Sequence, residues 1–158
     1  MPAAPPVLAE PPLCFPRLEA ASAEQAVRAL AKELHRAGYV KASFEAAAVL
    51  RERRSPTGLP FEGGAVALPH AEPEHVLKPA LAIATLVHPV RFREMGSPAN
   101  ALDVGLVVMP ALTAKEQAAA GLAQIIELLQ DAALRGTLRA ATDEAAMRRA
   151  LAGRRGGE

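Results

Sequence analysis

Three short apolar runs restrict what this chain can fold into: AVAL (65–68), ALAIATLV (80–87) and LDVGLVVM (102–109). They are rich in β-branched residues or nearly all apolar, with little alternation of apolar and polar positions. Strands covered on both faces have this composition, whereas strands with one solvated face alternate. We therefore expect central strands of a mixed sheet, with VRF (90–92) as a further short strand.

Helices are predicted on either side of these runs. Ser22-Ala-Glu-Gln25 is a capping box, after which apolar residues recur at helical spacing as far as Gly38. Ser43 is a second N-cap candidate, and this helix should end on RERR (51–54), because Pro56 disfavours helical backbone at Ser55. Three further helices are expected, one after the capping box Thr113-Ala-Lys-Glu116 and two over 131–139 and 142–151. This order predicts an α/β fold, a two- or three-layer sandwich of helices around the sheet.

At 158 residues the chain has the size of a single domain. Six of its fourteen prolines lie within residues 1–16, so we expect an extended or disordered arm over 1–17, a domain over 18–152 and a flexible tail over 153–158.

Composition excludes several functions. Eighteen basic residues balance seventeen acidic ones and aromatic residues make up 3%, so nucleic acid is not expected as a partner. No apolar run approaches the roughly 18 residues of a membrane span. The single Cys14 cannot form an internal disulfide, and the start of the chain lacks the features of a signal peptide, so we expect a cytosolic protein.

His70 is the first candidate for chemistry. The AVAL run would deliver it to the end of a strand, where open α/β sheets bind ligands, and Pro69 stiffens the backbone before it. A neutral imidazole can attack phosphorus and later release the group. A histidine at such a place can equally be a hydrogen-bonded structural residue. His75 forms His-x4-His with it, but without cysteines or a recognised ligand spacing no metal is expected.

Several motifs together resemble one family. RERRSPTGLP, VALPHAEPEHVLKPALAIATL, PVRF, MG, LDVGLVVM and LQD follow, in this order, the pattern of enzyme IIA domains of the phosphoenolpyruvate-dependent sugar phosphotransferase system (PTS). The resemblance covers residues 18–151. It is to the fructose/mannitol class and, within that class, to the galactitol-like branch.

The resemblance implies a mannitol-type enzyme IIA fold and a phosphoryl carrier without cofactor or metal. The phosphocarrier protein HPr would phosphorylate His70 at Nε2, and the group would pass to a cysteine of an enzyme IIB component. Nδ1 should then be held by an acceptor that fixes the tautomer.

Further site residues follow from the same resemblance. Arg51 matches the arginine of the family's R-E motif and could clamp the phosphoryl group, although a cation at a helix end can also simply complement the helix dipole. Ser55 or Thr57 could add a hydroxyl, or merely cap the local turn. Mannitol-type members have a second active-site histidine where this chain has Gln117, which can donate a hydrogen bond but cannot relay a proton. His75 either lines the site or holds its loop.

Two alternatives stay open. The chain could be a regulatory member, similar to nitrogen-type enzyme IIA, whose phosphorylation controls a target by surface contact. It could also be a noncatalytic binding module that kept the fold, which the presence of both His70 and Arg51 disfavours.

Overall fold

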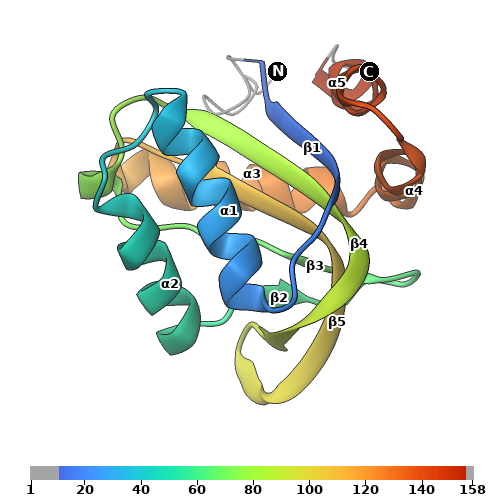
Figure 1. Cartoon of the computed structure of the whole chain (residues 1–158), viewed down its shortest axis with the longest axis horizontal. Coiled ribbons are helices and arrows are strands. Elements are labelled where there is room, and N and C mark those ends of the chain that lie inside the picture. Colours follow the sequence, from blue (N-terminus) through green and yellow to red (C-terminus); the bar gives the residue numbers. More distant parts are fainter. Residues whose placement is uncertain (1–10, 156–158) are drawn as a thin grey trace.

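The computed structural model describes residues 11–155, apart from the side chains of residues 115–117 and 154–155. Five strands form one mixed sheet (Figure 1). β4 (Ala80–Glu94) and β5 (Ser97–Ala111) form a long antiparallel hairpin, and β1 (Leu13–Leu18) runs parallel to β4. β3 (Ala65–Ala67) runs parallel to β5, and β2 (Gly58–Leu59) pairs with β3 and with the end of β4.

Helices cover both faces of the sheet, which confirms the predicted α/β sandwich. α1 (Ala23–Arg36) and α2 (Phe44–Arg54) lie on one face; α3 (Lys115–Leu129), α4 (Ala132–Ala140) and α5 (Glu144–Arg155) lie on the other (Figure 1). β5 shows why its sequence does not alternate. Val107 and Met109 pack toward α1 and α2, whereas Leu106 and Val108 pack toward α3, α4 and α5, and all four are buried. Among the described residues, no helix is long and apolar enough to cross a membrane.

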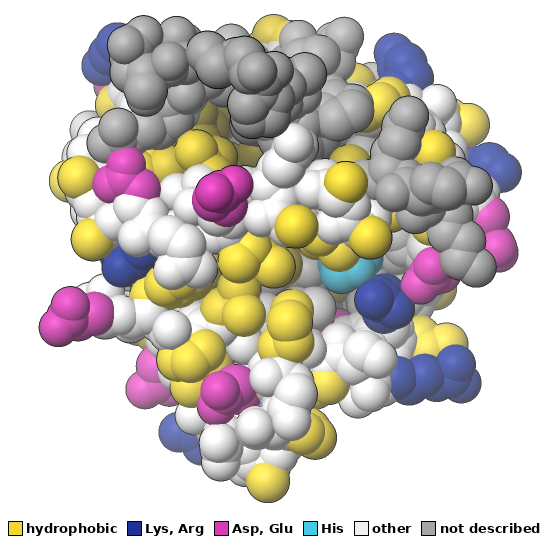
Figure 2. Space-filling view, turned by 180° about the vertical axis from the view of Figure 1, so that it is seen from behind, with side chains coloured by type: hydrophobic (Ala, Val, Ile, Leu, Met, Phe, Trp, Pro, Cys, Tyr) yellow, Lys and Arg dark blue, Asp and Glu magenta, His cyan; other side chains and the backbone are white. Residues whose placement is uncertain are grey.

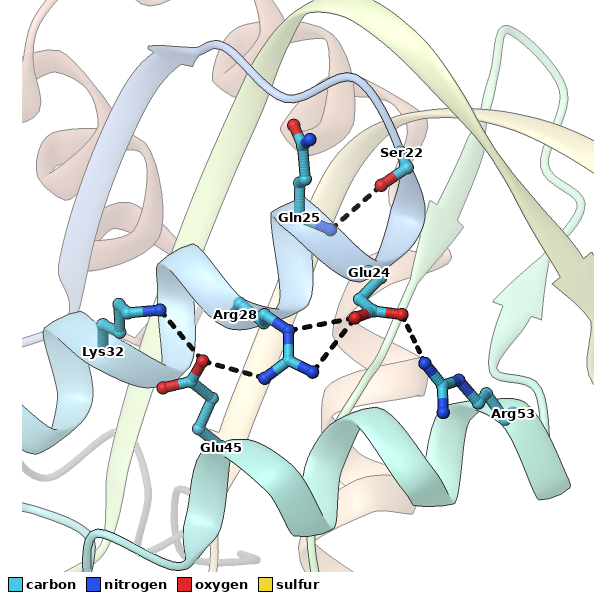
Figure 3. A network of polar contacts seen from close by, with 7 residues as sticks. All are labelled: Ser22, Glu24, Gln25, Arg28, Lys32, Glu45 and Arg53. Atoms are coloured by element: carbon cyan, nitrogen blue, oxygen red, sulfur yellow. Dashed lines mark hydrogen bonds and ion pairs between the residues drawn. The ribbon is translucent and has the colours of Figure 1, made fainter.

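A polar network joins α1 to α2 along their exposed sides (Figure 3). Glu24 of α1 accepts from Arg28 and from Arg53 of α2, and Glu45 of α2 accepts from Arg28 and Lys32. Solvent screens each of these pairs, so they align the two helices more than they stabilise the fold. The predicted N-cap of α1 is confirmed, because the Ser22 hydroxyl accepts from the backbone N–H of Gln25, while the Gln25 side chain accepts from Ala21, one residue before the N-cap.

Glycine is required at one turn near the end of α2. A Cβ at Gly58 would come within 2.6 Å of the carbonyl oxygen of Arg93, so only glycine lets β2 approach β4 this closely. The chain thus turns from α2 through Thr57 and Gly58 into the sheet.

The proline-rich start is the main difference from the predicted arrangement. Residues 13–17 of the predicted arm belong to β1, an edge strand that pairs with β4. Prolines are tolerated there, since an edge strand leaves part of its backbone unpaired, and Pro16 lies where the register shifts. Residues 1–10 of that arm lie outside the described residues.

Three other predicted elements differ from the structure. VRF is not a separate strand, because β4 continues through a bulge between Thr85 and Val90. The capping box at Thr113 is wrong: the backbone is still extended at Ala114, which becomes the N-cap of α3 without a side-chain bond. α5 extends to Arg155, so the predicted tail begins as helix.

Candidate functional site

β3 ends directly before His70 and fixes the backbone that presents it. Ala67 pairs with β2 on one side and with β5 on the other. Leu68 follows, fully buried, and Pro69 then restricts the chain before His70. His70 itself is mostly buried, with its imidazole folded back toward the strand end: its Nδ1 lies 2.8 Å from the Leu68 carbonyl oxygen. Because a carbonyl oxygen can only accept, Nδ1 carries the hydrogen.

Arg51 of α2 contacts the other ring nitrogen. Its Nε donates to His70 Nε2 over 3.1 Å, which requires a lone pair on Nε2 and therefore agrees with the tautomer that Leu68 sets. The Nη1 of Arg51 donates to the Glu72 carboxylate over 3.0 Å. The structure thus brings together two residues that lie 19 positions apart, and a carboxylate beyond them holds the guanidinium.

The surroundings of His70 favour the neutral form of its imidazole. Burial lowers the pKa of His70 below its usual 6.5, and the positive charge of Arg51 lowers it further. The Leu68 carbonyl and the Glu72 carboxylate act in the opposite direction, but burial is the largest effect. At neutral pH Nε2 therefore keeps its lone pair, as a nucleophile requires.

Thr57 is hydrogen-bonded to Glu52 and Leu68. It is buried, its hydroxyl donates to Glu52 over 2.8 Å, and the same oxygen accepts from the Leu68 N–H over 3.0 Å. Its one hydrogen is thereby used, so Thr57 is bound into the fold and does not offer its O–H to a phosphoryl group. Ser55 is exposed at the C-cap of α2, where its backbone N–H bonds to the Arg51 carbonyl.

His75 joins its loop to the start of α2. Its Nδ1 lies 2.8 Å from the Ser43 hydroxyl, and its backbone carbonyl accepts from the N–H of Lys41. Ser43 stands at the start of α2, roughly 12 Å along the helix from Arg51. Ser43 is the N-cap as predicted, but its hydroxyl bonds His75 instead of capping the helix.

Gln117 lies in the first turn of α3, as predicted. Its side chain lies outside the described residues, so its role near His70 stays a prediction.

Two acidic residues of this region were not predicted. Glu72 holds Arg51, and Glu52 accepts two hydrogen bonds from Thr57, through the backbone N–H and the hydroxyl. Neither stands in a spacing typical of catalysis. Glu52 is the glutamate of the R-E motif that contains Arg51, and Glu72 lies two residues after His70; these were the only signals in the sequence.

Figure 2 shows the molecule from behind the view of Figure 1. A histidine side chain is visible on this face, beside a basic side chain and among apolar ones. Near the site, Leu50 stands next to Arg51 on α2 and leaves 43% of its surface exposed.

The arrangement has the properties of a phosphoryl acceptor. A neutral imidazole presents Nε2, its Nδ1 hydrogen is held by a backbone oxygen, and a guanidinium that can bind phosphate oxygens lies beside it. No proton needs to leave the ring before such a nitrogen attacks.

The comparisons with known proteins agree with this class. The family model "Phosphoenolpyruvate-dependent sugar phosphotransferase system, EIIA 2" matches residues 10–153. The chain belongs to this family and is a phosphotransferase component, a phosphohistidine carrier. The resemblance to enzyme IIA domains that the sequence indicates is therefore confirmed, and membership of the galactitol-like branch stays a prediction.

Solved structures share the fold. The complex of enzyme IIA-Mtl with phosphorylated enzyme IIB-Mtl from Escherichia coli has a TM-score of 0.73 at 26% identity, covering 89% of this chain and 94% of that one. A protein from Streptococcus mutans described as PTS IIA (PtxA) has a TM-score of 0.77 at 20% identity, covering 98% and 96%.

A curated relative matches part of the chain. The transcriptional regulator ManR of Bacillus subtilis (strain 168) is 35% identical over 82 residues, which are 52% of this chain. The match spans only 12% of ManR.

Proposed function

We propose that this chain accepts a phosphoryl group from HPr on His70 Nε2 and passes it to a cysteine of an enzyme IIB component. The observation that carries the proposal is the state of the ring. Leu68 holds the hydrogen on Nδ1, and Nε2 faces the guanidinium of Arg51 with its lone pair.

The transfer then needs no proton movement. The Nε2 lone pair forms the new N–P bond while the donor's P–N bond breaks, and its electron pair stays on the donor nitrogen. The ring of His70 keeps its Nδ1 hydrogen and gains positive character, which the Leu68 carbonyl stabilises. In the second transfer the group leaves a neutral imidazole, a far better leaving group than an imidazolate.

Arg51 has to change partners during this reaction. In the present structure its Nε–H occupies the lone pair of Nε2, so the guanidinium must shift before phosphorus can approach. The arriving group carries about two negative charges on its oxygens, and a guanidinium can bind two of them at once. We assign Glu72 the role of keeping the released guanidinium within reach, since it holds Nη1 from the far side.

Other predicted residues have lesser roles in this proposal. The Gln117 amide would donate to a phosphoryl oxygen from the first turn of α3. Ser55 could offer a hydroxyl from the end of α2. No metal or cofactor takes part.

An enzyme IIB partner is supported by the similarity to enzyme IIA-Mtl, which was solved together with phosphorylated enzyme IIB-Mtl. The exposed Leu50 beside Arg51 would lie in that contact. The HPr partner and the cytosolic location stay predictions from the sequence.

A second function is supported by a separate observation. The match to ManR, a transcriptional regulator, shows that chains similar in sequence occur within regulators. In this alternative His70 is still phosphorylated, but its state controls a target through surface contact and no sugar is phosphorylated.

A phosphorelay with purified components separates the two. Enzyme I, HPr and phosphoenolpyruvate would label the chain in both cases, and candidate enzyme IIB components would then be added. Loss of label to a IIB cysteine supports the transport carrier. Stable label in the presence of every cognate candidate favours the regulator, and no labelling by HPr contradicts both.

A further inference from the structure

A continuous chain of hydrogen bonds leads from α2 to the back of the His70 ring. The Glu52 carboxylate accepts from the Thr57 N–H over 3.0 Å and from the Thr57 hydroxyl over 2.8 Å. The Thr57 oxygen accepts from the Leu68 N–H over 3.0 Å, and the Leu68 carbonyl accepts from His70 Nδ1 over 2.8 Å. Thr57 and Leu68 are both buried, with 3% and 0% of their surfaces exposed.

The chemistry of each group determines which one donates and which one accepts in these hydrogen bonds. A hydroxyl has one hydrogen, and when Glu52 is ionised its carboxylate accepts that hydrogen, so a lone pair of the Thr57 oxygen faces Leu68. Leu68 lies one residue beyond β3, so Thr57 supplies the acceptor that its N–H lacks in the sheet. Pro69 has no N–H with which to anchor the next step of the chain.

We propose that Glu52 and Thr57 are positioning residues for His70. Glu52 fixes the Thr57 hydroxyl, Thr57 fixes the Leu68 backbone, and the Leu68 carbonyl fixes the ring with its hydrogen on Nδ1. Neither side chain touches the phosphoryl group. Their effect is to keep Nε2 unprotonated and aimed at the incoming phosphorus.

The location of Glu52 argues against a purely structural carboxylate. Glu52 is partly buried, and moving a carboxyl group out of water is costly unless hydrogen bonds compensate it. Glu52 lines a cavity of about 330 Å³ between α1, α2 and β4. The other charged residues lining it are Glu24, Arg53, Arg91 and Arg93. Arg53 donates to Glu24 and Arg93 donates to the Ala99 carbonyl, so these two cations are directed away from Glu52. Its two side-chain bonds go to Thr57.

A matched pair of substitutions at Thr57 tests the proposal. Thr57→Val keeps the shape and removes the hydroxyl, leaving the Leu68 N–H without its partner. Thr57→Ser keeps the hydroxyl and loses a methyl group. Glu52→Gln removes one acceptor from Thr57, and Glu45→Gln makes the same change on the same helix, where the carboxylate pairs with Arg28 and Lys32 instead.

The first measurement does not depend on phosphoryl transfer. Nitrogen NMR of the imidazole, with the His70 signals assigned by their loss in His70→Gln, reports which ring nitrogen is protonated. We expect a single Nδ1–H tautomer in wild type and Thr57→Ser. Thr57→Val should show a mixture of both tautomers, and Glu52→Gln a smaller displacement in the same direction.

The second measurement rests on the proposed function and is single-turnover phosphorylation by phosphorylated HPr. Loss of ring orientation should slow Thr57→Val about tenfold and Glu52→Gln about threefold to tenfold. Thr57→Ser should stay within about twofold, and Glu45→Gln should be unchanged.

The outcomes separate the positioning role of Glu52 and Thr57 from the proposed phosphoryl-carrier function. Wild-type tautomer and rate in folded Thr57→Val and Glu52→Gln would overturn the positioning role. If melting curves show that Thr57→Val does not fold, Glu52→Gln against Glu45→Gln decides in the same way. A tautomer change in the variants while wild type accepts no phosphate from HPr would overturn the proposed function and support the positioning of the ring.

Discussion

Replacement of Arg51 distinguishes a phosphate clamp from an ordinary helix end. Its guanidinium contacts two groups at once, His70 through Nε and Glu72 through Nη1. Lysine keeps the charge but places it at a single point, so Arg51→Lys cannot make both contacts. If the residue only complemented the dipole of α2, lysine would serve equally well and transfer would be unaffected.

The structure allows the magnitude to be estimated. Loss of a charge-assisted hydrogen bond that matures in the transition state costs about 1.5–3 kcal/mol, or roughly tenfold to a hundredfold in rate. The Arg51 side chain is 36% exposed, so solvent screening places the effect toward the lower end. We expect Arg51→Ala to slow transfer from HPr by about tenfold, and Arg51→Lys to recover only part of that loss.

The assay is stopped-flow transfer from phosphorylated HPr, with melting curves of both variants as the control for folding. The pKa of His70 gives a second readout, because Arg51 lowers it in the folded protein. It should rise in Arg51→Ala and stay near the wild-type value in Arg51→Lys. Wild-type transfer rates in both variants would refute the clamp and leave RERR as a basic helix end.

Three further predictions concern the groups around the ring. Glu72→Gln should lower the pKa of His70, because the carboxylate raises it, and should slow transfer by a few-fold through a loosened Arg51; an unchanged NMR titration would contradict this. Burial raises the pKa of Glu52 from 4.5 to about 7, so the unfolded chain loses this proton first as pH rises. The unfolding free energy of wild type relative to Glu52→Gln should therefore be highest below about pH 4.5 and should fall by about 3 kcal/mol as pH rises through 7. A difference between the two proteins that stays constant from about pH 4.5 to above 7, measured by denaturant unfolding, would refute the shift. Ser43→Ala should cost about 1 kcal/mol at most and leave transfer unchanged, whereas a slowed reaction would place His75 in the site.

Patterning made much of the architecture predictable. The apolar runs predicted buried strands because both of their faces are covered, and the Ser22 capping box and Gly38 marked the limits of α1. β1 could not be found this way. Its prolines indicate an arm, and only its pairing with β4 makes it a strand.

The candidate site was predictable where a motif names its residues. His70 and Arg51 meet as expected, but the role of Glu72 depends on where the loop places its carboxylate, which no spacing indicates. Thr57 shows the converse. The motif made it a candidate for binding phosphate, and the fold uses its single hydroxyl hydrogen on Glu52.

The identity of the phosphorylated atom tests the account most directly. Wild type and His70→Gln would each be incubated with enzyme I, HPr and labelled phosphoenolpyruvate, and the labelled peptide mapped. We predict one acid-labile, alkali-stable phosphoryl group per wild-type chain, on His70, and none on a folded His70→Gln. Label on His75, or stoichiometric label on His70→Gln, would contradict the assignment of His70 as the nucleophile.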